Sequence, residues 1–285
     1  MSRREVLQHI YASDLIRLVK KPLGWAVEGF WVAQSQGVVA GEPKTYKSMF
    51  TLDMAVSIAS GLPFLNAHKV KQGTVLIVQE ENDEEIMKDR LVKIMSAKRL
   101  VPEDKIREVG TNTFNIKFAT HLPLIFINRR NFSLNDENNL KDLTSVIINE
   151  NVKMLILDPF YTMFDGNLND MQSVKEALKV ISSFNRKFKM SVILVHHNHK
   201  TPYNVKPSFM RGGQKMLGSM GMHAWTASGL YLTKEENRRN VITIEREFRA
   251  FPEMSDVRVV FSEGKAGSFG YGSSEAREQQ NLVFK

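Results

Sequence analysis

Residues 41–48 read GEPKTYKS and directly follow the apolar run GVVA at 37–40. Gly41, Lys47 and Ser48 match the phosphate-binding pattern G-x-x-x-x-G-K-[ST], but Tyr46 replaces the second glycine. In such loops backbone N–H groups surround the phosphates, the lysine neutralises charge and the hydroxyl holds Mg²⁺. A side chain on a left-handed backbone costs on the order of 1 kcal/mol, which is small beside the electrostatics of phosphate binding. The stretch therefore predicts a site for ATP and Mg²⁺.

The residues expected to contact the nucleotide are Gly41, Glu42, Pro43, Lys44, Thr45, Tyr46, Lys47, Ser48 and Met49. The alternative is a chance match within a strand, a turn and a helix. The surrounding sequence favours the nucleotide site, because an apolar strand precedes the loop and a helix is predicted from Lys47 to Ser60, ended by Gly61.

Apolar runs typical of strands alternate with helical periodicity along the chain. Strands are predicted near 37–40, 73–80, 152–159 and 190–197, and helices near 82–100, 136–150 and 170–188. The helix after residue 82 is expected to bury Ile86, Leu91, Ile94 and Met95. Runs at 226–233, 240–247 and 256–261 alternate in polarity, as antiparallel edge strands do. The sequence predicts an α/β fold with a mostly parallel central sheet flanked by helices and with antiparallel strands at its C-terminal edge.

The chain has 285 residues, 42% of them hydrophobic, which is enough for one sizeable core. We expect an N-terminal arm or helix at 1–30, a core at 31–262 and a flexible, Gly/Ser-rich tail at 263–285. The absence of cysteine excludes disulfides and thiolate metal sites. No apolar run is long enough to cross a bilayer, so a soluble cytoplasmic protein is expected. A net charge of +8 makes a polyanionic partner plausible.

Carboxylates follow two of the predicted strands. Asp158 ends the run LILD, where it can hold Mg²⁺ together with Ser48. Glu80 and Glu81 end the run VLIVQEE, and we predict that Glu80 polarises an attacking water while Glu81 points elsewhere. Alternatively, both glutamates only begin the acidic first turn of the next helix.

Histidines end the strand predicted at 190–197, in the run VILVHHNHK. His196 and His197 can cap the core, bind a metal together with His199, or contact the terminal phosphate at the strand tip beside Asp158. No carboxylate lies at a suitable spacing for a metal site, so the phosphate contact is favoured.

The order of the motifs GEPKTYKS, VLIVQEEN, LILDPF, NLNDMQSV and VILVHHNHK resembles the RepA-type hexameric replicative helicases and related phage and plasmid ATPases of the RecA superfamily, over roughly residues 25 to 262. The resemblance implies a RecA-like P-loop core in which Lys47 and Ser48 bind phosphate and Mg²⁺. It also implies that Glu80 is the general base, Asp158 the Walker B carboxylate and His197, with His196, the sensor. Members of the family usually have an Arg-Gly-Ser motif after the histidines. This chain has Leu217, Gly218 and Ser219 there, so Arg211 or Lys215 can take the place of the missing arginine.

By the same resemblance, the segment 198–217 would face a central channel and follow single-stranded DNA. It carries the cations Lys200, Lys206, Arg211 and Lys215, which suit backbone contacts that do not read bases. The alternative is an ordinary solvated loop, and 161–169 is a second, weaker candidate for a channel loop. Arg246 is preferred over Arg249 as the cation that reaches the γ-phosphate of the nucleotide bound by the adjacent subunit.

These observations predict an ATPase that assembles as a homo-oligomeric ring, with a hexamer expected, and moves along or separates DNA strands. One alternative is a recombination or annealing ATPase of the same fold without unwinding activity. A small-molecule P-loop kinase is disfavoured, because no arginine-rich lid is evident.

Overall fold

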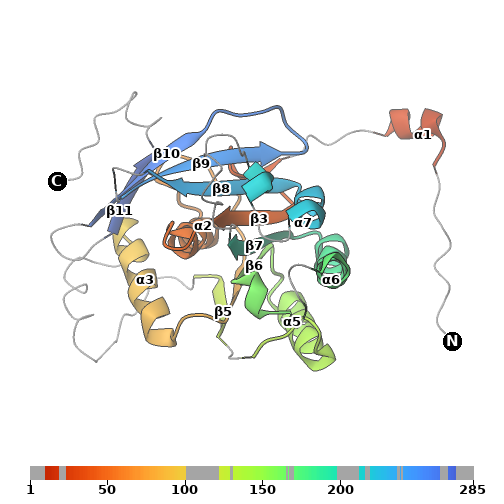
Figure 1. The fold of residues 1–285 in the computed structure, drawn as a ribbon, viewed down its shortest axis with the longest axis horizontal. Helices are drawn as coiled ribbons and strands as arrows, with labels where there is room; N and C mark the ends of the chain where they lie inside the picture. Colours follow the sequence, from red (N-terminus) through yellow and green to blue (C-terminus); the bar gives the residue numbers. More distant parts are fainter. Residues whose placement is uncertain are drawn as a thin grey trace.

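Eleven strands and six α-helices make up the part of the chain that the computed structural model describes (Figure 1). The described residues are 10–18, 24–100, 122–128, 131–164, 166, 170–197, 212–215, 219–235, 238, 240–263 and 269–273. The helices are α1 (Ala12–Arg17), α2 (Lys47–Ser60), α3 (Glu84–Ala97), α5 (Glu137–Asn149), α6 (Met171–Phe188) and α7 (Ser219–Trp225). Two 3-10 turns are η2 (Phe160–Thr162) and η4 (Gly212–Lys215).

Nine strands form one sheet in the order β11-β10-β9-β8-β3-β7-β6-β4-β5. They are β3 (Gln36–Gly41), β4 (Val75–Gln79), β5 (Leu124–Asn128), β6 (Met154–Asp158), β7 (Ser191–His197), β8 (Ser228–Lys234), β9 (Val241–Phe248), β10 (Val257–Glu263) and β11 (Phe269–Ser273). The six strands from β8 to β5 pair in parallel, whereas β8 to β11 pair antiparallel. A separate antiparallel pair joins β1 (Trp25–Val27) to β2 (Trp31–Val32). The predicted fold class is confirmed.

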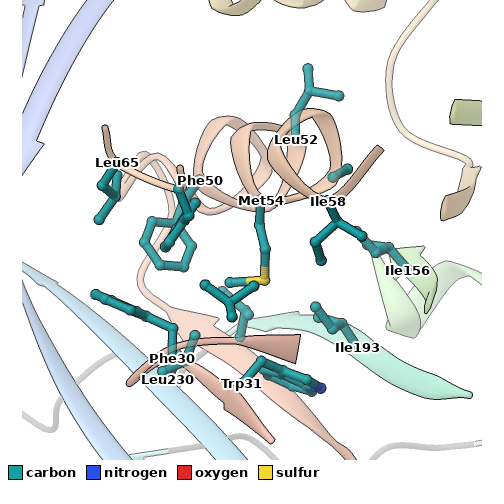
Figure 2. Close-up of a cluster of buried hydrophobic side chains, with 14 of the residues drawn as sticks. Phe30, Trp31, Phe50, Leu52, Met54, Ile58, Leu65, Ile156, Ile193 and Leu230 are labelled. Carbon is teal, nitrogen blue, oxygen red and sulfur yellow. The ribbon is translucent and has the colours of Figure 1, made fainter. Parts of the chain in front are cut away.

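Helices cover both faces of the parallel strands (Figure 1). Helices α2 and α3 lie on one side, and α5 and α6 lie on the other. Figure 2 shows Met54 and Ile58 of α2 pointing toward Ile193 and Leu230 of the sheet. Alternate residues of each strand enter opposite cores, which is why these strands read as continuous apolar runs.

Local signals in the sequence account for several helix ends. Helix α2 has the predicted bounds and ends at Gly61, whose φ of 78° suits a residue without a side chain. Asp136 and Asp170 cap α5 and α6 by accepting backbone N–H groups of the first turn. Because these caps satisfy donors that would otherwise lack partners, the helices start where the two aspartates stand.

Two details differ from the sequence analysis, and a third stays untested. The buried face of α3 contains Met87 instead of Ile86, which is 45% exposed, because Met87 lies seven residues before Ile94 and therefore on the same side. Strand β8 is antiparallel to β9 but parallel to β3, so it joins the two parts of the sheet. The division into arm, core and tail stays a prediction, although Val27 is fully buried and β11 lies within the range assigned to the tail.

No helix in the described ranges is both long and apolar enough to span a membrane.

Candidate active site

Four neighbouring parallel strands, β3, β7, β6 and β4, end at the same edge of the sheet. Their pairing puts Gly41 opposite His197 and Asp158 opposite Gln79. The loop after β3, His197 at the end of β7, Asp158 and the glutamates after β4 therefore lie at one edge of the sheet. Carboxyl ends of strands in open α/β sheets are where ligands bind.

The loop from β3 to α2 is tightly closed around Gly41. A Cβ atom there would lie 2.6 Å from the carbonyl oxygen of Leu232 and 2.7 Å from Oγ1 of Thr45. Thr45 is buried and donates its hydroxyl to the carbonyl oxygen of Glu42 across 2.8 Å. The first position of the pattern is thus glycine because the neighbouring strand leaves no room for a side chain.

Tyr46 adopts the left-handed backbone conformation, with φ 62° and ψ 18°, directly before α2. Its ring stacks on Phe261 at 4.3 Å between centroids, with 17° between the ring planes. Tyr46 makes no side-chain hydrogen bond that caps α2. The N–H groups of the first turn of α2 are therefore not capped by this residue, an arrangement suited to an anion.

Lys47 is buried and points back over the loop. Its Nζ donates to the carbonyl oxygens of Gly41 at 2.9 Å and Glu42 at 2.8 Å. Burial lowers the Lys47 pKa to about 8, against the opposing influence of Asp158, Glu81 and Glu42. An ammonium held by two loop carbonyls lies within reach of a phosphate placed in the same loop.

Asp158 is 5% exposed, and its burial raises the carboxyl pKa to about 6. A hydrogen bond with the Ser48 side chain and the charges of Arg90 and Lys47 oppose that rise, whereas Glu81 adds to it. A hydroxyl and a carboxylate in contact are the oxygen ligands that Mg²⁺ prefers. A buried carboxylate without a full counter-charge also gains from a nearby cation. Ser48 and Asp158 therefore fit the predicted Mg²⁺ site.

The two adjacent glutamates differ in surroundings. Glu80 accepts the backbone N–H of Asn131 at one carboxylate oxygen across 2.8 Å, and its other oxygen is buried without a hydrogen-bond partner among the described residues. Glu81 acts electrostatically on Lys47, Asp158 and His197. The charge of Glu81 therefore lies near the phosphate loop, although the sequence analysis assigns the catalytic role to Glu80 alone. A cavity of about 440 Å³, lined by residues 79–85 and Asn128, adjoins both glutamates.

His197 borders the site and His196 does not. The ring of His197 lies 5.4 Å from that of Tyr161, and burial together with the charge of Lys47 lowers the His197 pKa. His196 is 1% exposed and packs against Phe160 on the opposite face of the strand. Successive residues of a strand alternate between its faces, so of these two histidines His197 is the one placed to sense a phosphate. His199 lies outside the described residues.

The structure contradicts the prediction that Arg246 reaches the nucleotide of an adjacent subunit. It is 6% exposed and donates to the carbonyl oxygens of Gly29 and Ser255, and its guanidinium lies over the Phe30 ring. These contacts hold the arginine inside its own subunit, because alternation along β9 turns it toward the core. Arg249 is exposed and donates to the carbonyl oxygen of Ala224, so it is the accessible arginine of this pair.

Two side chains near the site were not identified from the sequence. Arg90 of α3 lowers the pKa of Asp158, and Nη1 of this arginine is buried without a hydrogen-bond partner among the described residues. Gln79 is 1% exposed and accepts the backbone N–H of Glu81 across 2.5 Å, which orients that residue. Neither belongs to a recognisable motif. Arg90 could have been found only from its position on the first turns of a helix that follows a strand of the site.

Most of the predicted nucleic-acid contacts lie outside the described residues, namely Lys200, Lys206 and Arg211. The backbone of Lys215 lies in η4, and its side chain is not among those described. That turn is attached to β9, because the N–H of Gly212 donates to the Glu245 carboxylate across 2.7 Å. Tyr161, in the second candidate loop, is 41% exposed and next to His197.

Comparisons with known proteins agree with this geometry. The sequence model of an AAA domain family, AAA_25, matches residues 2–202. One ATPase domain of known structure superposes with a TM-score of 0.60 and 12% identity, covering 83% of this chain and 84% of that one. A DnaB-like replicative helicase, solved in a study of its interactions with primase, superposes with a TM-score of 0.60 and 13% identity. The match covers 90% of this chain and 64% of that helicase. At these identities the likeness shows the fold, and no curated protein sequence matches.

Proposed function

Since the chain belongs to the AAA_25 family of AAA domains, we propose that this P-loop ATPase is a nucleic-acid motor, a ring-forming helicase that moves on single-stranded DNA. The observation that carries the proposal is the meeting of Lys47, Ser48 and Asp158 at the N-terminus of α2. The fold shared with the solved ATPase domain and with the DnaB-like helicase favours a motor over a small-molecule kinase.

Different residues of the site contact different parts of a bound nucleotide in this proposal. The N–H groups at the start of α2 and the ammonium of Lys47 neutralise phosphate charge, and Ser48 and Asp158 hold the metal. ATP with Mg²⁺ supplies the bond to be hydrolysed and the cation that stabilises charge on the phosphate oxygens. His197, whose pKa is lowered, is a neutral hydrogen-bonding group at the tip of β7 near neutral pH.

A carboxylate of the adjacent pair Glu80 and Glu81 polarises the attacking water. Glu80 has the geometry for the task, since Asn131 fixes one carboxylate oxygen and leaves the other without a protein partner in the described part of the chain. Glu81 is the alternative, because its charge acts on Lys47 and Asp158. Single turnover of bound ATP decides between them. Replacing the base with glutamine should lower the rate by about 10²-fold or more with little change in ATP affinity, whereas the other variant should keep most of the rate.

A trans-acting arginine completes the site only in an oligomer. Arg249 takes this role in the proposal, since Arg246 is engaged inside its own subunit. Mixing Arg249→Ala subunits with Lys47→Ala subunits tests the assignment. Each variant alone should lack activity, and mixed assemblies should recover part of it, because an intact loop then faces an intact arginine in some interfaces. Failure to recover any activity in verified mixed assemblies contradicts the role of Arg249.

Single-stranded DNA is the proposed track, and the cations at 200, 206, 211 and 215 are its contacts. Affinity should fall steeply with salt, and replacing these four residues with glutamine should flatten that slope. An unchanged slope removes the segment from the interface. The second candidate function, annealing without unwinding, rests on the same site and differs only in what the assembly does with DNA.

The central test measures ATP hydrolysis by the wild-type chain, by Lys47→Ala and by a control, Lys153→Ala. Lys153 is exposed at the opposite end of the sheet, and its Nζ donates to the side chain of Asn151. The loop variant should lose turnover and the control should keep it. Displacement of a strand from a forked duplex then supports the motor, whereas pairing of complementary strands without displacement supports annealing. Sizing with ATP and single-stranded DNA distinguishes a ring from a filament or a monomer.

A further inference from the structure

Tyr46 occupies a backbone conformation that a side chain disfavours. Its φ of 62° and ψ of 18° lie in the left-handed region, at the position where the phosphate-binding pattern has glycine. Glycine adopts this region freely, whereas the Cβ atom of any other residue crowds the backbone there. Interactions of Tyr46 must therefore offset this strain.

One contact that can do so is the stack on Phe261. The rings are nearly parallel, at 17°, with centroids 4.3 Å apart. Phe261 is 3% exposed and belongs to the core on the α2 face of the sheet. Its backbone is fixed on both sides: its N–H donates to the carbonyl oxygen of Asn240, and Nδ2 of Asn240 donates to its carbonyl oxygen, both at 2.8 Å.

Phe261 is thus held in place by the sheet, whereas Tyr46 lies in the loop directly before α2. A stacked aromatic pair is stabilised by a free energy similar to the strain of one left-handed residue. With residue 46 in the left-handed conformation, the Tyr46 ring lies on Phe261 of strand β10. A contact of this strength can offset the strain of the loop conformation.

We propose that Tyr46 and Phe261 form an aromatic clamp that positions the phosphate loop and ties it to strand β10, in place of the glycine that the loop lacks. The proposal rests on nucleotide binding at this loop. Both residues are positioning residues, because they act on the loop backbone and not on a reacting atom. A direct consequence is that the shape of the nucleotide site depends on the antiparallel edge of the sheet.

Substitutions at residue 46 separate the clamp from ordinary packing, because they remove the Cβ atom and the ring in different combinations. Tyr46→Phe keeps both and should leave the dissociation constant for Mg-ADP within about twofold. Tyr46→Gly removes the ring together with the strain and should bind within about threefold of the wild type. Tyr46→Ala keeps the Cβ atom without the ring and should bind about fivefold more weakly than Tyr46→Gly. Simple loss of packing predicts the reverse order, with glycine the worst.

Phe261→Leu provides the second measurement. It should weaken Mg-ADP binding about tenfold when residue 46 is tyrosine and less than about twofold in the Tyr46→Gly background. A matched control is Val259→Ala, also buried in β10, which should lower the unfolding temperature without this dependence on residue 46. Equal losses in both backgrounds show that Phe261 only supports the fold.

Isothermal titration of the full-length chain with Mg-ADP measures these affinities without hydrolysis. For ATP hydrolysis, the loss of the clamp should raise KM more than it lowers kcat. If Tyr46→Ala and Tyr46→Gly bind equally well in a chain that does bind nucleotide, the clamp is refuted and the proposed function stands. If the wild-type chain binds no nucleotide, or Lys47→Ala binds as well as the wild type, the proposed function falls and the clamp with it.

Discussion

Replacing Asp158 with asparagine should stabilise the ligand-free chain while it abolishes Mg²⁺-dependent activity. Burial raises the carboxyl pKa from its ordinary value of 3.8 to about 6. One pKa unit corresponds to about 1.4 kcal/mol, so the shift makes ionisation of this residue cost about 3 kcal/mol in the folded chain. Asparagine has nearly the same shape, carries no charge and can still accept the hydroxyl of Ser48.

The sign of the effect follows from proton binding. Because the folded pKa exceeds the unfolded one, the folded chain holds more protons between about pH 4 and 6, and the free energy of unfolding falls as the pH rises through that window. The stabilisation by Asp158→Asn should therefore be small near pH 4, grow until about pH 6 and remain at about 3 kcal/mol at pH 8.

Urea unfolding followed by circular dichroism, in EDTA and at several pH values, measures this difference. Asp170→Asn is the control, because that aspartate is exposed and caps α6, a position that asparagine also fills well. It should give no gain in stability. With Mg²⁺ and ATP the order should reverse, since a ligand that needs Asp158 stabilises only the wild type. A variant that is less stable than the wild type at pH 8 without ligand, or a difference that does not change with pH, refutes the reasoning.

Three further changes probe the fold around the site. Lys98→Met leaves the Asp53 carboxylate buried without the ammonium that lies 2.9 Å away, and should lower the free energy of unfolding by about 3 kcal/mol in urea titrations. Gly41→Ala forces a Cβ atom to within 2.6 Å of the Leu232 carbonyl oxygen and should reduce both the unfolding temperature and nucleotide affinity, which calorimetry can follow. Arg246→Met removes buried hydrogen bonds to Gly29 and Ser255 and should cost about 2 kcal/mol of stability, an effect that a surface arginine would not show in thermal unfolding.

Two control variants accompany the Lys98 and Arg246 predictions. A Lys98→Met, Asp53→Leu double variant should recover much of the lost stability, because it removes the charge that the single change leaves unpaired. Arg249→Met, at an exposed position of the same segment, should change stability by less than about 0.5 kcal/mol. Equal losses for Arg246→Met and Arg249→Met contradict the structural role given to Arg246.

Regular patterns account for much of what the sequence predicts. The helix from Lys47 to Ser60 has the bounds that its sequence indicates, since a glycine ends it and an apolar strand and a loop precede it. Asp158 and His197 lie at strand ends as expected, because apolar runs of five to seven residues have unambiguous termini. Their meeting follows from the rule that parallel strands end at one edge. These inferences need only neighbouring residues and the period of a strand or helix.

Predictions that depend on the direction of a single side chain are less successful. The sequence puts Glu80 and Glu81 side by side and gives no reason for the charge of Glu81 to act on Lys47. That proximity depends on the turn after β4, in which the N–H of Glu81 donates to Gln79. The burial of Arg246 depends on carbonyl oxygens at positions 29 and 255, which are distant in the chain.

The sequence by itself determined an α/β nucleotide-binding chain, since a loop motif, strand-length apolar runs and their polar ends are local features. Only the tertiary structure decided that β3 lies between β7 and β8, that Arg246 is enclosed and that the Tyr46 ring rests on Phe261. Such pairings join segments far apart in the chain, and they are selected by the close packing of a whole core, which no short stretch of sequence encodes.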